Sequence, residues 1–204
     1  MLTEIDKLMS GVVVMAIFRN MPVNDAIELA HKAWDLGIEL IEVPIQTPDA
    51  IPVLEAVVKA GRDRGKRVGA GTVTTEDQVH IAERLGVAFT VAPGLDRDVL
   101  EASRRLGVPH IPGVASASEI QSAVRLGCTW VKAFPAVVLG GGWFKAMKHG
   151  PFPNVSFLAT GGVDASNAKE FLTAGASVVA VGSALADPSQ IDLLAGLIGN
   201  SREI

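Results

Sequence analysis

Hydrophobic and polar positions follow one repeated order along the chain: an amphipathic helical stretch ends at a glycine, and a β-rich run begins directly after it. Six junctions fit this order, at Gly37, Gly65, Gly86, Gly107, Gly127 and Gly175. Glycine suits the left-handed backbone that closes a helix. The intervals from Gly65 through Gly86 and Gly107 to Gly127 are 21, 21 and 20 residues, the length of one compact strand and helix. The pattern therefore predicts repeated β/α units.

Eight runs rich in β-branched residues predict strands. They cover residues 12–18, 40–46, 67–72, 88–93, 110–114, 129–134, 156–160 and 178–182. Amphipathic segments between them predict helices that include residues 24–36, 75–85, 96–106, 116–126 and 166–174. Asn24, Thr75, Asp96 and Ser116 are suited to cap the starts of four of these helices. Residues 75–78 and 116–119 also match the capping-box pattern.

Eight alternating units in 204 residues predict a single-domain α/β protein spanning 1–204, a compact (β/α)8 TIM barrel with few insertions. A doubly wound open sheet is the weaker alternative. In a barrel, the chemistry gathers at the carboxyl ends of the strands. The residues expected there are Arg19, Glu42, Gln46, Thr72, Pro93, Lys132, Gly161, Gly162, Gly182 and Ser183.

Lys132 is the first candidate for chemistry, because it lies in the apolar run 129–135, which is short enough to be a buried strand. Burial disfavours a charged ammonium, so an amine held there can stay neutral and attack a carbonyl carbon. The alternative is a lysine paired with a carboxylate in the core. Trp130, Lys132 and Phe134 share one face of the strand because side chains alternate.

Glu42 is the second candidate, a carboxylate inside the apolar run 40–45. A buried acid must be satisfied by a partner or serve a function. If Glu42 and Lys132 both point into the barrel, they can approach one another. Catalysis is the preferred interpretation, and a purely structural buried ion pair between the two is the alternative.

Two glycine-bearing turns indicate phosphate binding. Gly161 and Gly162 follow the predicted seventh strand, and Gly182 and Ser183 follow the eighth. Many barrels hold a phosphate at these two positions against backbone N–H groups. The run Gly140–Gly142, after the sixth strand, is expected to form a flexible loop beside Lys132.

Composition narrows the choice of partners. A net charge of −4 without a basic cluster argues against nucleic acid. The apolar stretches are short and interrupted, and the first residues lack the features of a signal peptide, so we expect a soluble cytoplasmic protein with no membrane partner. Cys128 is the only cysteine, and the four histidines lie far apart in sequence. We therefore expect no disulfide, no metal site and no cofactor.

Several segments together resemble a known family, the class I 2-keto-3-deoxy-6-phosphogluconate (KDPG) and 4-hydroxy-2-oxoglutarate (KHG) aldolases. The resemblance covers nearly the whole chain and rests on residues 41–43, 68–73, 92–94, 111–114, 131–135, 150–155 and 160–163. Their order and spacing are specific as a set. The family has a (β/α)8 barrel and forms a Schiff base, and its members are commonly homotrimers.

The resemblance implies a role for each matching position. Lys132 matches the Schiff-base lysine, Glu42 the general acid and base, and Thr72 a contact to the pyruvyl carboxylate. Pro93 and Phe134 match residues that pack around the substrate. A further set matches the phosphate cradle: Gly161, Gly162, Gly182 and Ser183. The implied partner is a small 2-keto-3-deoxy sugar-acid phosphate.

One position departs from the phosphogluconate branch, which has an arginine where this chain has Gln46. Arg19 ends the first strand instead, as it does in phosphogalactonate-type members, and a guanidinium can hold a carboxylate from either strand end. Gln46 could hydrogen-bond a substrate hydroxyl. The main substrate thus stays open between phosphogluconate, phosphogalactonate and hydroxy-oxoglutarate types. A phosphosugar isomerase or synthase on the same barrel, and a non-catalytic sugar-phosphate sensor, are the further alternatives.

Overall fold

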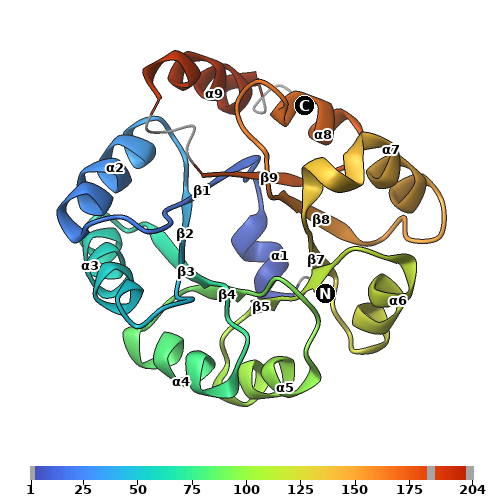
Figure 1. Ribbon diagram of the computed structural model, residues 1–204, viewed down its shortest axis with the longest axis horizontal. Coiled ribbons are helices and arrows are strands. Elements are labelled where there is room, and N and C mark those ends of the chain that lie inside the picture. The colour runs from blue at the N-terminus through green and yellow to red at the C-terminus, as the bar shows by residue number, and fades with distance from the viewer. Residues whose placement is uncertain (1–2, 183–186, 201–204) are drawn as a thin grey trace.

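The computed structural model describes residues 3–182 and 187–200, which form one α/β barrel of parallel strands surrounded by helices (Figure 1). The strands are β1 (Val14–Ile17), β2 (Leu40–Pro44), β3 (Arg67–Gly71), β4 (Phe89–Val91), β5 (His110–Ile111), β6 (Gly113–Val114), β7 (Trp130–Ala133), β8 (Ser156–Thr160) and β9 (Val178–Val181). Every strand pair is parallel. The prediction of a barrel is confirmed.

The ring closes through the predicted fifth strand, which is divided at Pro112. The strand order is β5-β4-β3-β2-β1-β9-β8-β7-β6, so its two ends, β5 and β6, are consecutive in the chain. Proline has no N–H to donate to a ladder, and the two halves pair on opposite sides, β5 with β4 and β6 with β7. The described strands therefore occupy eight positions around the barrel.

The helices are α1 (Glu4–Met9), α2 (Val23–Asp35), α3 (Ala50–Asp63), α4 (Glu76–Leu85), α5 (Arg97–Leu106), α6 (Ala117–Arg125), α7 (Ala136–His149), α8 (Ala168–Thr173) and α9 (Pro188–Asn200). Helices α2 to α9 form the outer ring (Figure 1). The five predicted helices are present with shifted ends. All six junction glycines have a positive φ, between 66° and 111°, as expected for residues that close a helix.

The predicted caps are mostly confirmed. The side chains of Thr75, Asp96 and Ser116 each accept backbone N–H bonds at the starts of α4, α5 and α6. Asn24 is a correction, because α2 begins at Val23 after Pro22 and Asn24 lies inside its first turn. Pro22 occupies the N-cap position, and its side chain makes no cap hydrogen bond.

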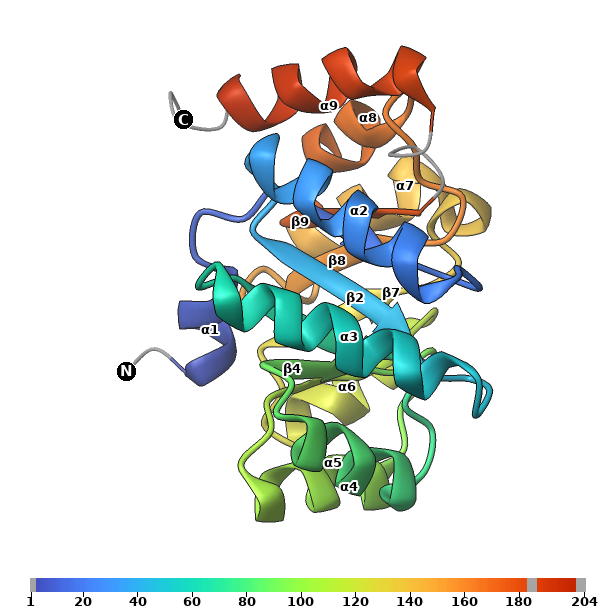
Figure 2. The ribbon, with the colours of Figure 1, turned by 90° about the vertical axis from the view of Figure 1, so that its left-hand side faces the viewer.

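The short helix α1 closes the amino end of the barrel. Ile5, Leu8 and Met9 join a cluster of inward-facing strand residues that includes Met15 and Phe89. Figure 1 shows α1 inside the ring, and Figure 2 shows it on the side away from the strand arrowheads. Asp6 of α1 also accepts a 2.9 Å hydrogen bond from Trp130 Nε1. The opposite, carboxyl end of the barrel carries the predicted site.

The glycine run after β7 corrects one expectation. Gly140, Gly141 and Gly142 lie within α7, not in a flexible loop, and only Gly140 interrupts the helix, with φ 74° and ψ 161°. A Cβ at Gly141 would lie 3.0 Å from Glu170 Oε1. Glycine here allows α7 to approach its neighbour α8 closely, and this packing outweighs the low helix propensity of the run.

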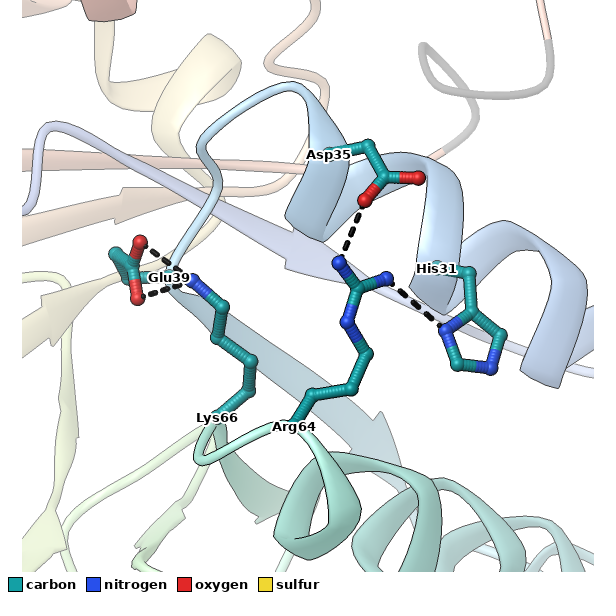
Figure 3. A network of polar contacts seen from close by, with 5 residues as sticks. All are labelled: His31, Asp35, Glu39, Arg64 and Lys66. Carbon is teal, nitrogen blue, oxygen red and sulfur yellow. Dashed lines mark hydrogen bonds and ion pairs between the residues drawn. The ribbon is translucent and has the colours of Figure 1, made fainter.

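A polar network joins the ends of α2 and α3 on the outside of the barrel (Figure 3). Arg64 donates to Asp35 Oδ1 at 2.6 Å and contacts His31 Nδ1 at 3.1 Å, while Lys66 donates to both oxygens of Glu39. The arginine side chain has only hydrogen-bond donors, so His31 Nδ1 accepts the bond from Arg64 and the ring N–H of His31 is at Nε2. The network fixes the spacing of two neighbouring β/α units.

Candidate active site

Lys132 projects into the barrel from β7. Its strand neighbours Val131 and Ala133 face the helices, whereas Trp130 belongs to the interior cluster, so alternation turns Lys132 inward. The residue is 1% exposed. Its Nζ lies 5.2 Å from the centroid of the Phe134 ring and makes no hydrogen bond or ion pair with the described residues.

Glu42 projects into the barrel from β2 and is fully buried. Neither carboxylate oxygen has a hydrogen-bond partner among the described residues. The side chain has room because Gly71 lies next to it on β3, and a Cβ at Gly71 would overlap the Glu42 carboxylate. A buried acid without a partner is costly, so this arrangement favours a functional group over a structural one.

The two residues face one another across the barrel. β2 and β7 hold the second and sixth of eight positions, which are opposite walls of the ring (Figure 1). No ion pair joins Glu42 and Lys132 among the described residues. The structural alternative, a buried ion pair between them, is therefore not observed. Lys132 and Glu42 thus place an amine and a carboxylate, not paired with one another, inside the same barrel.

A pocket of about 600 Å³ opens at the carboxyl ends of the strands. Several predicted residues line it, coming from the segments after β1, β7, β8 and β9: Arg19, Phe134, Gly161, Gly162 and Gly182. Lys132 and Glu42 lie deeper in the barrel and do not line its wall. The Phe134 ring connects the two levels, since it contacts Lys132 Nζ on one side and packs against Gly161 on the other.

The paired glycines have the backbone expected of an anion cradle. Gly161 and Gly162 have φ values of 97° and 75°. Their carbonyl oxygens are turned away, accepting from Val137 N and Asn167 Nδ2, and neither glycine N–H has a recorded partner among the described residues. Free N–H groups beside a pocket can bind phosphate oxygens. Ser183, the last residue of the predicted cradle, lies outside the described residues.

The remaining predicted residues surround the mouth without lining this pocket. Gln46 is exposed and donates to Asn20 Oδ1 at 3.2 Å, so it is already engaged by a residue of the β1 segment. Pro93 is half-buried, and Gly113 allows its carbonyl to approach closely. Thr72 follows β3 with φ 56°, an unusual conformation for a β-branched residue. Arg19 is thus the predicted cation on the pocket wall.

Gln78 of α4 holds the segments after β2 and β3 together. Its Nε2 donates to the Ile45 carbonyl at 3.0 Å, and its Oε1 accepts from Thr74 N at 2.7 Å. Thr75 does cap the helix by accepting from Gln78 N, but the expected return bond goes to Thr74. The predicted capping box at 75–78 is therefore only half formed, and the Gln78 side chain instead joins Ile45 to Thr74, two residues after Thr72.

Thr160 is a candidate that sequence reasoning missed. It ends β8, is 2% exposed, lines the pocket, and its hydroxyl has no hydrogen-bond partner among the described residues. A signal was available, because alternation with the interior residue Leu158 turns Thr160 inward at a strand's carboxyl end.

The described residues contain neither a metal-binding cluster nor a membrane-spanning helix. No group of three or more His, Cys, Asp or Glu side chains that could hold a metal ion occurs within residues 3–182 and 187–200. No helix in the same ranges is long and apolar enough to cross a membrane.

The fold and the site together define a (β/α) barrel with a buried lysine and a buried glutamate, and with a pocket at the carboxyl ends of the strands. Residues 5–194 match the model of the KDPG and KHG aldolase family. The chain belongs to this family, whose members are lyases.

Individual relatives agree with this assignment. The chain is 36% identical over 172 residues, 83% of its length and 78% of the relative's, to a 2-dehydro-3-deoxy-phosphogluconate aldolase of Pseudoalteromonas atlantica. It is 29% identical over 172 residues, 84% of its length and 83% of the relative's, to a 2-dehydro-3-deoxy-6-phosphogalactonate aldolase of Escherichia coli. A crystal structure of KDPG aldolase from Legionella pneumophila, with pyruvate captured as a covalent carbinolamine, superimposes with a TM-score of 0.82 at 32% identity and covers 97% of both chains.

Proposed function

We propose that this chain is a class I aldolase that reversibly cleaves 2-dehydro-3-deoxy-6-phosphogluconate to pyruvate and glyceraldehyde 3-phosphate. The observation that carries the proposal is the buried Lys132 amine, without an ionic partner, across the barrel from the unpartnered Glu42 carboxylate. The covalent pyruvate adduct in the Legionella relative supports the same chemistry. We take the whole chain, 1–204, to act as one barrel domain.

The proposed reaction begins with attack of neutral Lys132 Nζ on the 2-keto carbon, which gives a carbinolamine. Loss of water forms an iminium between Lys132 and the substrate. This cation accepts the electron pair of the C3–C4 bond when that bond breaks, so carbon–carbon cleavage needs no metal ion as electron sink.

Glu42 is the proposed proton carrier. It removes the proton of the C4 hydroxyl, directly or through a water, and the C4 carbon leaves as the aldehyde of glyceraldehyde 3-phosphate. The enamine of pyruvate stays on Lys132, and Glu42 returns the proton to its methylene carbon. Hydrolysis of the resulting iminium then releases pyruvate and regenerates the free amine.

The pocket residues hold the two charged ends of the substrate in this proposal. Arg19 and Thr72 bind the carboxylate, and Phe134 and Pro93 pack against the carbon chain. The free N–H groups of Gly161 and Gly162 support binding of the phosphate, with Gly182 beside them. We add Thr160, whose unpartnered buried hydroxyl can bind a polar atom of the substrate. Ser183 keeps its predicted phosphate role as a proposal from sequence.

A second substrate, the phosphogalactonate epimer, is supported by Arg19. This arginine lines the pocket, while Gln46 replaces the second-strand arginine of the phosphogluconate branch and is bound to Asn20. A panel of the two C4 epimers and 4-hydroxy-2-oxoglutarate, compared by kcat/KM, decides the main substrate.

An isomerase or synthase is less well supported, because a phosphate pocket alone would serve it and the buried Lys132 and Glu42 would have no role. A non-catalytic sensor has the same weakness. Either of these functions would leave Lys132 unreactive toward pyruvate.

The first experiment is intact-mass spectrometry after incubation with pyruvate and sodium borohydride. We expect one reduced pyruvyl adduct on the wild type and none on Lys132→Ala. Lys145→Ala is the matched control, because Lys145 is an exposed lysine of α7, and it should trap pyruvate like the wild type. No adduct on the wild type would overturn the aldolase mechanism.

We also propose that the protein is a homotrimer located in the cytoplasm. Exposed apolar side chains support self-association, above all Val137 and Val138, which are 55% and 77% exposed at the start of α7. A phosphorylated sugar acid is too polar to cross a membrane unaided, which favours an enzyme in the compartment where the substrate is made.

A further inference from the structure

A second cavity lies at the opposite end of the barrel from Lys132. Its volume is about 260 Å³, and its wall combines α1, α5 and the segments that lead into β5 and β7. Ile5, Leu100, Val108 and Trp130 give it a mainly apolar lining. The cavity is separated from the proposed active site by the interior side chains of the barrel, because Trp130 begins β7 and Lys132 lies two residues further along.

Three polar atoms of residues on this wall have no hydrogen-bond partner among the described residues. Ser103 is 1% exposed, and its hydroxyl makes no hydrogen bond with them. His110 Nε2 and Thr129 Oγ1 are also buried without a partner. All three residues line the cavity. Buried polar groups in native proteins nearly always have a partner, so these unpartnered groups on one cavity wall indicate that something else occupies the cavity.

The unpartnered imidazole nitrogen presents a donor. The other ring nitrogen, Nδ1, lies 2.8 Å from the Thr90 hydroxyl, whereas that hydroxyl is 3.4 Å from the Pro109 carbonyl. The shorter contact favours a hydroxyl that donates to Nδ1, which leaves the ring proton on Nε2. Burial lowers the pKa of His110 to about 4, so the ring is neutral near pH 7.

The charged groups around the cavity are mostly paired or exposed. Asp6 accepts from Thr3 and from Trp130 Nε1, and Glu4 forms an ion pair with Lys7. Arg104 donates to the Leu126 carbonyl, has no ion pair with the described residues and is exposed. The buried part of the cavity therefore offers neutral hydrogen-bonding groups and apolar surface, and its one unpaired cation lies at the solvent-exposed side.

We propose that this cavity is a binding site for a small uncharged molecule with an apolar body and an alcohol or carbonyl oxygen. The oxygen accepts from His110 Nε2–H or bonds with the Ser103 hydroxyl, and the apolar part lies against Leu100 and Trp130. The inference does not depend on the aldolase function, because none of the residues that carry it is in the proposed active site.

Water is the competing occupant, since a cavity of this size has room for several molecules. Benzyl alcohol is a suitable probe because it combines a ring with one hydroxyl. Benzoate is the matched control, having the same ring and a negative charge. We expect saturation-transfer NMR to detect benzyl alcohol on the wild type at millimolar concentration and to show benzoate bound at least tenfold more weakly.

Single substitutions test whether benzyl alcohol binds in this cavity. Ser103→Ala should weaken benzyl alcohol binding about threefold to tenfold through loss of one hydrogen bond. Ser122→Ala, which removes an exposed hydroxyl of α6, should leave binding unchanged. Binding should also persist unchanged in Lys132→Ala and in the presence of saturating pyruvate, which separates this site from the active-site pocket.

The half-buried Cys128, the only cysteine of the chain, lines the same cavity and gives an independent measurement. At a benzyl alcohol concentration of about three times its dissociation constant, alkylation of Cys128 by iodoacetamide should slow about fourfold, because only the unoccupied cavity leaves the thiol accessible. Absence of binding on the wild type would mean that water alone fills the cavity and would overturn the proposal. Equal binding to Ser103→Ala, equal binding of benzoate, or unchanged Cys128 alkylation would overturn it as well.

Discussion

At the scale of single residues, Gly71 decides where the Glu42 carboxylate can lie. The two residues are on adjacent strands, the Glu42 side chain passes over Gly71, and only the missing Cβ of Gly71 leaves room for the acid. The same site that needs a buried carboxylate therefore also needs a glycine next to it.

Gly71→Ala tests this dependence. The new methyl group would displace Glu42, so we expect a destabilisation of about 1–3 kcal/mol and at least a tenfold slower formation of the pyruvyl adduct on Lys132. Gly142→Ala is the control, because nothing lies within 4 Å of a Cβ there. Chemical denaturation and the borohydride assay measure both effects. A Gly71→Ala protein with wild-type rate would disprove the steric argument.

His110 predicts a pH dependence of stability. Desolvation lowers its pKa from 6.5 to about 4 in the folded protein. Between these values the unfolded chain binds more protons, so stability falls as the pH drops from about 6.5 to 4, by up to roughly 1.4 kcal/mol per pH unit. Above pH 6.5 the residue contributes no pH dependence.

Denaturant unfolding of wild type and His110→Phe across pH 4–8 measures this effect. The variant should lose less stability than the wild type between pH 6.5 and 4. Carboxylates with lowered pKa values, such as Asp6 and Glu119, add a loss at the acidic end in both proteins, so the difference between the two curves isolates the histidine. Parallel curves would show that His110 does not titrate as expected.

At the scale of elements, Gln78 links α4 to the two segments that follow β2 and β3. Gln78→Leu removes both the bond to Ile45 and the bond to Thr74. We expect pyruvyl adduct formation to slow roughly tenfold with an unchanged circular dichroism spectrum, because the segment after β3 that contains Thr72 and Thr74 is no longer tied to Ile45. Gln78→Glu keeps the acceptor for Thr74 and should recover part of the rate.

The control for this experiment is Gln121→Leu. Gln121 is exposed on α6, and its side chain makes no hydrogen bond with the described residues. It should behave like the wild type. If Gln78→Leu unfolds more easily but traps pyruvate at the normal rate, Gln78 stabilises the fold without positioning the site.

The helix α1 is too short to be stable alone, so its contribution must come from packing. Leu8 is 6% exposed against the interior cluster, and Leu8→Ala should cost about 2–4 kcal/mol in the free energy of unfolding. Lys7→Ala on the same helix removes only an exposed ion pair and should cost less than about 0.5 kcal/mol. Similar losses for both variants would mean that α1 does not act as an apolar plug.

At the scale of the whole molecule, sedimentation equilibrium tests the proposed trimer. The expected mass is three times the 21.3 kDa of one chain, about 64 kDa. Val138→Glu places a charge on the most exposed apolar residue of α7 and should shift the protein toward smaller species. A wild-type mass of one chain would disprove the proposal, and the barrel would then function as a monomer.

Much of the fold follows from short-range pattern. The glycine junctions with positive φ and the caps at Thr75, Asp96 and Ser116 depend on neighbouring residues alone. Lys132 and Glu42 are recognisable for a related reason, since a charged residue within an apolar strand violates the local pattern that surrounds it. The sequence by itself therefore determined the repeating units, the barrel class and the two central candidates.

Tertiary structure decided the features that depend on residues far apart in the chain. The closure at Pro112, the burial of α1 in the barrel, the helical Gly141 and the bond from Gln78 to Ile45 each require a partner from another unit. The placement of Glu42 and Lys132 on opposite walls is also a tertiary feature, because it depends on the order of the strands around the ring. Local propensity does not specify these contacts between distant residues, because strand register and ring closure are set only when all the strands pair together.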